Sequence, residues 1–272
     1  MRHTPLRNTL ALLVAGATAL VALATPGAQA AKAATPDGYV ALGDSYSSGN
    51  GANSTNLDFF CNRNTYAYPY LVAQQRPNTA LTFVACGGAT TTDVNNNQIS
   101  ALASTTKFVT ITIGGNDIGF VNLLTSCWAY NDDAQCQAAA DTANGKIANQ
   151  LGAALDGTYA RIKAASPTAT VVVLGYPNPL GTNLSCLAAD GISTANRTSI
   201  NSVVTNLESK ISNRVAAAGF TYKSAISPFG GHDICASDPW VNGKAWNLAD
   251  AYHPSRSGYA NGYTPLVRAV IG

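Results

Sequence analysis

The sequence predicts an α/β fold, in which helices cover both faces of a parallel β-sheet. Two observations predict it. Short, nearly continuous apolar segments alternate with longer segments that can form helices, as in a parallel sheet that is buried on both sides. Polar, glycine-flanked turns also follow the first three apolar segments. Since functional groups in such sheets gather at the carboxyl ends of the strands, we expect these turns at one edge.

Five segments have the composition of strands, and three of the segments between them have the character of helices. The expected strands are residues 39–42, 81–85, 108–113 and 171–174, with a weaker one near 220–223. The expected helices are residues 66–76, 141–165 and 195–218, the last two ending near Pro167 and Gly219.

The first thirty residues have the pattern of a secretory signal peptide. Arg2 and Arg7 give a positive start, residues 10–24 form an apolar run, and Ala-Gln-Ala at 28–30 is a signal-peptidase motif. The run is too short to span a membrane and lacks the polar face of an amphipathic helix. We therefore expect residues 1–30 to be removed and the protein to be secreted.

The rest of the chain, residues 31–272, is expected to form one domain, because it shows no internal repeat, charge block or long linker. The formal net charge of +2 comes from Arg2 and Arg7, so the mature chain is nearly neutral. Neither nucleic acid nor an anionic membrane surface is therefore an expected partner. We expect no stable membrane insertion, and a monomer, because no coiled coil or long apolar surface stretch is visible.

All the cysteines lie in the mature chain, and their even number in an exported protein predicts three disulfides. Their spacing leaves the pairing open. It also argues against a zinc site, because there is no Cys-x-x-Cys and histidine is scarce. The six residues are Cys61, Cys86, Cys127, Cys136, Cys186 and Cys235.

Only two histidines, His232 and His253, lie in the mature chain, so a hydroxyl activated by imidazole must use one of them. Asp250 precedes His253 by three residues and could accept the Nδ1–H, which leaves Nε2 free to take a proton. His232 lies near Cys235, and packing against a disulfide is its simpler interpretation. We therefore expect His253 to be the base.

Ser45 is the candidate nucleophile, because it lies in Gly-Asp-Ser-Tyr directly after the first strand. A strand-to-helix turn there would present both its hydroxyl and its backbone N–H. Gly88 and Asn116 follow the next two strands and could supply two further donors to an oxyanion. Each motif alone is weak, but all three at strand ends in order are unlikely to arise by chance. The chain has no Gly-x-Ser-x-Gly, dinucleotide, P-loop or zinc-protease motif.

Four segments together resemble the signature blocks of the SGNH, or GDSL, hydrolases, and most closely the secreted lipases and esterases of actinomycetes. The similarity extends over essentially the whole mature chain. The segments are Ala-Leu-Gly-Asp-Ser-Tyr-Ser-Ser-Gly at 41–49, Ala-Cys-Gly-Gly-Ala at 85–89, Ile-Gly-Gly-Asn-Asp at 113–117 and Asp-Ala-Tyr-His-Pro at 250–254.

The resemblance implies a three-layer α/β/α sandwich with a flavodoxin-like sheet of five parallel strands in the order 2-1-3-4-5. It implies that Ser45 is the nucleophile, that Gly88 and Asn116 join Ser45 in the oxyanion hole, and that His253 is the base. It also implies sequential disulfides, 61–86, 127–136 and 186–235. Asp250 matches the Asp-x-x-His form and is assigned as the orienting acid; in some relatives a backbone carbonyl, here that of Ala251, takes this role.

Other conspicuous residues have simpler interpretations. Asp44 and Asp117 flank the site, and capping of the adjacent turns is favoured over catalysis for both. Trp128, Trp240 and Trp246 could line an acyl groove, but aromatic residues are more often part of the core.

The sequence therefore predicts a single secreted catalytic domain that hydrolyses carboxylic esters through an acyl-enzyme, with no metal or organic cofactor. Lipids are the expected substrates, triacylglycerols and short to medium acyl esters first and phospholipids second. The alternatives are an acetylxylan-type carbohydrate esterase, a serine peptidase and an inactive secreted binding module. The inactive module is disfavoured because all four site residues are present. Acyl chain length depends on loops such as 53–64 and 178–191 and is not predicted.

Overall fold

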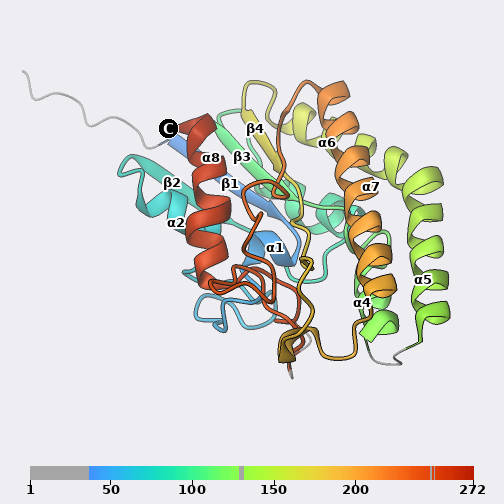
Figure 1. Ribbon diagram of the computed structural model, residues 1–272. Coiled ribbons are helices and arrows are strands. Elements are labelled where there is room, and N and C mark those ends of the chain that lie inside the picture. The colour runs from blue at the N-terminus through green and yellow to red at the C-terminus, as the bar shows by residue number, and fades with distance from the viewer. Residues whose placement is uncertain (1–36, 129–131, 246, 248) are drawn as a thin grey trace, which may run out of the picture. The chain divides into compact units, whose positions relative to one another are not determined.

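The computed structural model describes residues 37–272 apart from 129–131, 246 and 248, so the expected signal peptide lies outside the described residues (Figure 1). Its centre is an all-parallel sheet in the order β2-β1-β3-β4-β5, which confirms the predicted fold. The strands are β1 (Asp37–Gly43), β2 (Thr79–Phe83), β3 (Phe108–Thr112), β4 (Thr170–Leu174) and β5 (Thr221–Lys223).

The interior strands β3 and β4 each match the predicted ranges to within one residue, because both consist of apolar side chains and threonines buried on both faces. The edge strand β2 begins and ends two residues earlier than predicted. Its residues alternate between half-buried and exposed, which weakens its sequence signal. Val84 and Ala85 still follow β1, since both donate N–H bonds to the Ala41 carbonyl, at 3.0 and 3.1 Å.

Helices cover both faces of the sheet and give three layers (Figure 1). One face carries α2 (Tyr68–Gln74) and α8 (Thr264–Ile271), the latter preceded by a π-helical turn (Gly258–Tyr263). The other face carries α4 (Phe120–Trp128), α5 (Asp133–Lys146), a π-helical turn (Ile147–Leu151), α6 (Gly152–Ala165) and α7 (Thr194–Ala218). The short elements are α1 (Ser45–Ser48), α3 (Thr91–Asp93), a π-helical turn (Val94–Gln98) and two 3₁₀ turns (Ile99–Ala101 and Leu187–Ala189).

The predicted long helix begins earlier than expected, at Asp133, and continues through the π-helical turn to Ala165. The Asp132 side chain caps its start by accepting the N–H bonds of Ala134 and Gln135. Helix α7 agrees with its prediction to one residue and ends at Gly219, which has φ +73°. Helices α4 and α8 were not predicted.

Three disulfides join the six cysteines: Cys61–Cys86, Cys127–Cys136 and Cys186–Cys235. This is the pairing that the family resemblance implies. The first bridge ties the loop after α1 to the segment after β2, and the third ties two loops that lie between β4 and α8. Within the described ranges, no helix is long and apolar enough to cross a membrane.

Candidate active site

Ser45 is the first residue of α1, immediately beyond the carboxyl end of β1. The turn before it requires glycine: Gly43 has φ +122°, and a Cβ there would lie 2.4 Å from the Thr112 carbonyl oxygen and 2.6 Å from Ser47 Oγ. The absence of a side chain at Gly43 therefore lets β1 run close to β3 and then turn sharply into α1. This turn places the Ser45 side chain at the sheet edge.

The Ser45 hydroxyl lies 2.7 Å from Nε2 of His253, although the two residues are 208 positions apart. The other ring nitrogen, Nδ1, lies 2.9 Å from the Ala251 carbonyl oxygen. A carbonyl oxygen can only accept, so Nδ1 carries the proton and Nε2 of the neutral ring accepts from the Ser45 hydroxyl. The pair is thus arranged for transfer of the serine proton to the imidazole.

Asp250 does not make the hydrogen bond that the sequence assigned to it. Its carboxylate accepts the Gly51 N–H at 2.9 Å and the Asn247 side-chain amide at 2.9 Å. The partner of the His253 ring is instead the carbonyl of Ala251, the alternative that the family resemblance allowed. Asp250 acts on the imidazole only through its charge, which raises the pKa of His253.

The backbone conformation of Tyr252 explains why the Ala251 carbonyl faces the ring of His253. Tyr252 has φ +58°, a conformation uncommon for a bulky residue, and it lies between the two groups that bond. Hydrogen bonds hold it on both sides: its N–H donates to the Asn242 carbonyl at 3.1 Å, and its carbonyl accepts the Tyr46 hydroxyl at 2.7 Å. The ring of Tyr46 also packs against His253, with 4.9 Å between ring centroids.

Burial lowers the pKa of His253 to about 4, although the Ala251 hydrogen bond and the Asp250 charge act in the opposite direction. The ring is therefore neutral at and above pH 5. A neutral imidazole next to a serine hydroxyl can act as a general base over this whole range.

The structure describes the donor groups of the three residues that the sequence assigned to an oxyanion hole. Asn116 donates one amide hydrogen to the Ala89 carbonyl at 3.0 Å, which fixes the amide and leaves its second hydrogen for a ligand. Gly88, the residue before Ala89, has φ +82°. Within the described part of the chain, the N–H groups of Ser45 and Gly88 have no hydrogen-bond acceptor. Ser45 and Asn116 line one cleft with His253, whereas Gly88 lines a different pocket, with Cys61 and Cys86.

The buried Asp44 carboxylate caps α1 and also bonds two side chains from other segments. It caps α1 by accepting the Tyr46 N–H at 3.0 Å, as the sequence suggested. It also accepts the hydroxyls of Thr112, at 2.7 Å, and of Tyr176. The Tyr176 hydroxyl in turn accepts the Gly115 N–H at 3.1 Å. The ends of β1, β3 and β4 are thus connected, and the loop that carries Asn116 is tied to the turn that carries Ser45.

The cleft beside Ser45 has an apolar wall made largely by α4, the helix that was not predicted. Apolar residues at helical spacing after the Gly-Gly-Asn-Asp turn were the signal that could have revealed it. Of the three tryptophans, Trp128 lines this wall and Trp246 lies outside the described residues. The wall residues are Phe120, Val121, Leu124 and Trp128.

The other sequence candidates have structural roles. His232 stacks on Trp240 with 3.7 Å between ring centroids, and its Nδ1 lies 2.8 Å from the Asp238 carbonyl oxygen. It does not line the cleft. Asp117 accepts the Thr91 N–H at 3.1 Å and the Thr91 hydroxyl at 2.5 Å. It therefore ties its loop to the first turn of α3, whose cap is Thr90, and does not cap its own turn as the sequence suggested.

Similar known proteins identify the family of this chain. A model of the GDSL-like lipase/acylhydrolase family matches residues 41–260. The chain is 40% identical to Lipase 1 of Streptomyces coelicolor, over 94% of each chain. It resembles the crystal structures of phospholipase A1 from Streptomyces albidoflavus (42% identity, TM-score 0.82) and an extracellular lipase from Streptomyces rimosus (38%, 0.82), covering 86% of this chain and 99% of theirs. The chain belongs to the GDSL-like lipase/acylhydrolase family and is an ester hydrolase.

Proposed function

We propose that this protein is an extracellular lipase that cleaves acyl esters of lipids with Ser45 as nucleophile and His253 as general base. The observation that carries the proposal is the 2.7 Å contact between the Ser45 hydroxyl and Nε2 of an imidazole whose other nitrogen is held by the Ala251 carbonyl. This contact lies in a cleft with an apolar wall on one side. No further group is needed to transfer the proton.

These contacts support the following acylation step. His253 takes the proton of Ser45 as the hydroxyl oxygen attacks the ester carbonyl, and the Ala251 carbonyl stabilises the resulting imidazolium through Nδ1–H. The negative oxygen accepts from the N–H groups of Ser45 and Gly88 and from the free amide hydrogen of Asn116. His253 then gives its proton to the leaving alcohol, which completes the acyl-enzyme.

Deacylation repeats these steps with water. His253 takes a proton from the water that attacks the acyl carbonyl, the same donors hold the oxyanion, and the imidazolium returns the proton to Ser45 Oγ. The network of Asp44 and Tyr176 keeps the serine turn and the Asn116 loop in register through both half-reactions.

The apolar wall supports a lipid acyl chain as the group next to the ester. Relatives named lipase and phospholipase A1 support the same class. We rank triacylglycerols and short to medium acyl esters first. Phospholipids are the second candidate, because the phospholipase A1 resembles this chain over nearly its full length. The acetyl-xylooligosaccharide esterase among the similar structures is 15% identical and supports only the shared fold.

Secretion is part of the proposal. The signal-like pattern of residues 1–30 and the three disulfides both favour an oxidising, extracellular location. N-terminal sequencing of the protein from culture medium should give a mature chain that starts at residue 31. We also expect the mature protein to be a monomer, which sedimentation velocity would test.

The Ser45→Ala variant tests the nucleophile. We expect it to fold normally and to lose at least about 10⁴-fold in kcat on p-nitrophenyl butyrate. Labelling by a fluorophosphonate should modify Ser45 in the unsubstituted protein and be absent in the variant. The control is Ser202→Ala, which removes an exposed serine of α7 that does not line the cleft and should change neither readout. Undiminished turnover in Ser45→Ala would refute the assignment.

A panel of substrates tests the lipid class. Triolein, dioleoylphosphatidylcholine, acetylated xylan and casein should be assayed side by side with equal enzyme. We expect hydrolysis of triolein to be fastest, with measurable release of fatty acid from phosphatidylcholine. Faster cleavage of acetylated xylan than of either lipid would replace the lipase proposal with a carbohydrate esterase, and cleavage of casein would indicate a peptidase.

A further inference from the structure

Few large hydrophobic side chains are exposed among the described residues, and they are unevenly placed. They are Leu57 (47% exposed), Phe59 (74%), Phe60 (90%), Val121 (53%) and Leu187 (91%). They belong to the loop after α1, to α4 and to the 3₁₀ turn after β4. All three segments follow the carboxyl ends of strands, and in Figure 1 they lie along the lower side of the molecule. This is the side of the sheet on which Ser45 lies.

Three of these side chains, Leu57, Phe59 and Phe60, lie on one short loop that we call the aromatic tip (residues 57–60). Phe59 and Phe60 are neighbours in the chain, and their rings meet edge to face with 5.8 Å between centroids. Water contact over two adjacent phenyl rings is costly, at about 25 cal/mol for each Å² of apolar surface. A contiguous exposed apolar group of this kind is typical of a surface that binds something.

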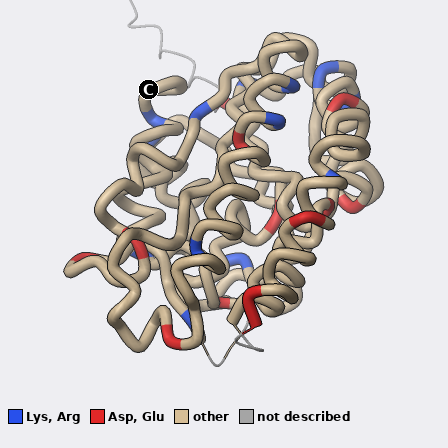
Figure 2. The backbone as a smooth tube through the Cα atoms, turned by 45° about the vertical axis from the view of Figure 1, so that its right-hand side comes forward, with Lys and Arg blue, Asp and Glu red and all other residues tan. Residues whose placement is uncertain are grey.

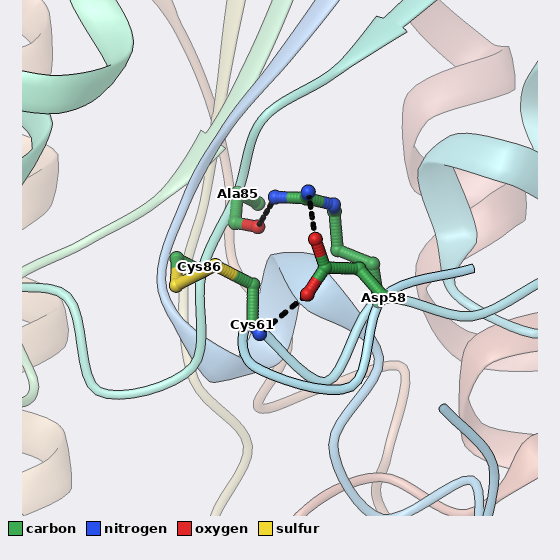
Figure 3. A network of polar contacts seen from close by, with 5 residues as sticks. Asp58, Cys61, Ala85 and Cys86 are labelled. Carbon is green, nitrogen blue, oxygen red and sulfur yellow. Dashed lines mark hydrogen bonds and ion pairs between the residues drawn. A yellow bond between two sulfur atoms is a disulfide. The ribbon is translucent and has the colours of Figure 1, made fainter. Parts of the chain in front are cut away.

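Hydrogen bonds and an ion pair fix the loop that carries the aromatic tip. Asp58 and Arg63 form an antiparallel bridge, in which the Arg63 N–H donates to the Asp58 carbonyl at 3.0 Å. The Asp58 carboxylate accepts the Arg63 guanidinium at 2.5 Å and the Cys61 N–H at 2.9 Å, and Arg63 also donates to the Ala85 carbonyl at 3.2 Å. Figure 3 shows this network beside the Cys61–Cys86 disulfide. Exposure of the two rings is therefore a property of a fixed loop.

The same contacts join the aromatic tip to the oxyanion donors. Cys61, directly after Phe60, is bonded to Cys86, and its carbonyl accepts the Gly87 N–H at 3.0 Å. Gly88 is the next residue. The tip is thus anchored two residues from a group that we assign to the oxyanion hole, so whatever the tip binds lies close to the site.

The charges of this loop favour a neutral partner. Asp58 and Arg63 are the only charged residues between 53 and 64, and they neutralise each other. Figure 2 shows acidic and basic residues mixed across the lower part of the molecule, with no basic cluster there. A surface that attracts by charge would need unpaired Lys or Arg. An apolar tip without free charge is instead suited to insertion between uncharged or zwitterionic lipids.

We propose that the aromatic tip is an interfacial anchor, which inserts Phe59 and Phe60 into the surface of aggregated neutral or zwitterionic lipid and holds the cleft against it. The inference rests on the proposed function for its partner, since a lipase must reach esters that are packed in an emulsion or a bilayer. It adds to that function the element that binds the interface. The tip takes no part in bond cleavage, so hydrolysis of dissolved esters does not depend on it.

The test separates binding from catalysis by using the Ser45→Ala background. Cosedimentation with phosphatidylcholine vesicles should show at least about tenfold weaker partitioning for Phe59→Ser/Phe60→Ser. Leu187→Ser, an equally exposed residue on another loop, is the matched control and should retain at least half of the partitioning. Binding should not weaken in 0.5 M NaCl, and it should not be stronger on phosphatidylglycerol vesicles. Unchanged partitioning of the double variant, or binding that requires the anionic lipid, would overturn the proposal.

Activity assays complete the test in the protein that retains Ser45. Phe59→Ser/Phe60→Ser should hydrolyse dissolved p-nitrophenyl acetate within twofold of the parent but lose at least about tenfold of its rate on triolein emulsion. Equal losses on both substrates would show that the loop acts on the active site, and would overturn the anchor. The proposed function fails separately, if the parent protein binds phosphatidylcholine vesicles through the tip yet releases no fatty acid from any lipid.

Discussion

Replacement of Asp250 by Asn gives the sharpest test of how His253 is oriented. The substitution removes the carboxylate charge, keeps the size of the side chain, and leaves an oxygen that can still accept the Gly51 N–H. It does not touch the Ala251 carbonyl that holds Nδ1 of His253. Two readings of the Asp-x-x-His motif therefore predict different results.

The magnitudes are far apart. If a carboxylate oriented the ring, its loss would cost about 10⁴-fold in kcat, or about 5.5 kcal/mol. In this structure the substitution removes only the attraction between a partly exposed carboxylate and the imidazolium. Screened by solvent, that attraction is about 1 kcal/mol, which corresponds to about fivefold. We therefore expect kcat to fall by less than tenfold.

The assay is steady-state hydrolysis of p-nitrophenyl butyrate, with folding checked by circular dichroism. His253→Ala sets the lower limit and should lose at least about 10⁴-fold. Asn247→Ala is the matched control, because it breaks the other hydrogen bond of Asp250 and keeps the charge. A loss of about 10³-fold or more in kcat for Asp250→Asn, but not for Asn247→Ala, would refute the conclusion that the Ala251 carbonyl orients His253.

Three further predictions follow from the site. The pKa of His253 is about 4, so the ring is mainly neutral at pH 5.5, where an ordinary histidine with a pKa of about 6.5 is mainly protonated. We therefore expect kcat/KM on a soluble ester to stay near its plateau at pH 5.5, and a midpoint at 6.5 or above would contradict this. Tyr46→Phe leaves the buried Tyr252 carbonyl without its donor. We expect this change to lower the free energy of unfolding by about 1–3 kcal/mol and also to lower kcat. An unchanged midpoint of urea unfolding would contradict the prediction. Val121→Trp narrows the cleft at its apolar wall. We expect the rate on p-nitrophenyl laurate to fall at least about tenfold relative to the rate on p-nitrophenyl acetate. An equal effect on both esters would show that this wall does not hold the acyl chain.

The sheet could be predicted because its central strands carry an unbroken apolar signal. Because β3 and β4 are buried on both faces, they have no polar residues other than threonine, and the ends of the apolar segments mark the ends of the strands. The edge strand β2 and helix α4 were harder for opposite reasons. β2 is exposed at alternate residues, whereas α4 is short, with 9 residues, and begins soon after the Gly-Gly-Asn-Asp turn.

Three of the predicted site residues come together in one cleft, and strand order accounts for two of them, Ser45 and Asn116. Ser45, Asn116 and His253 line one cleft, because β1 and β3 are neighbours and the segment after α7 returns to the same edge. The partner of His253 could not be predicted in this way. Asp250 and Ala251 are both close enough in sequence to reach the His253 ring. Which of them bonds it depends on the positive φ of Tyr252, a conformation that a tyrosine in the sequence does not predict.

Asp44 shows most clearly what sequence reasoning could not reach. Capping of α1 accounts for one of its three hydrogen bonds, while the partners of the other two are Thr112, at the end of β3, and Tyr176, in the loop after β4. Burial raises its pKa to about 6, so holding the carboxylate ionised costs roughly 3 kcal/mol. Because this pKa is higher in the folded than in the unfolded chain, the stability from Asp44 falls as pH rises from about 4 to 6. The hydrogen bonds of the Asp44 carboxylate hold the Ser45 turn, through Tyr176, in a fixed position relative to the loop of Asn116. Asp44 thus maintains the geometry of the site while it lowers the stability of the fold.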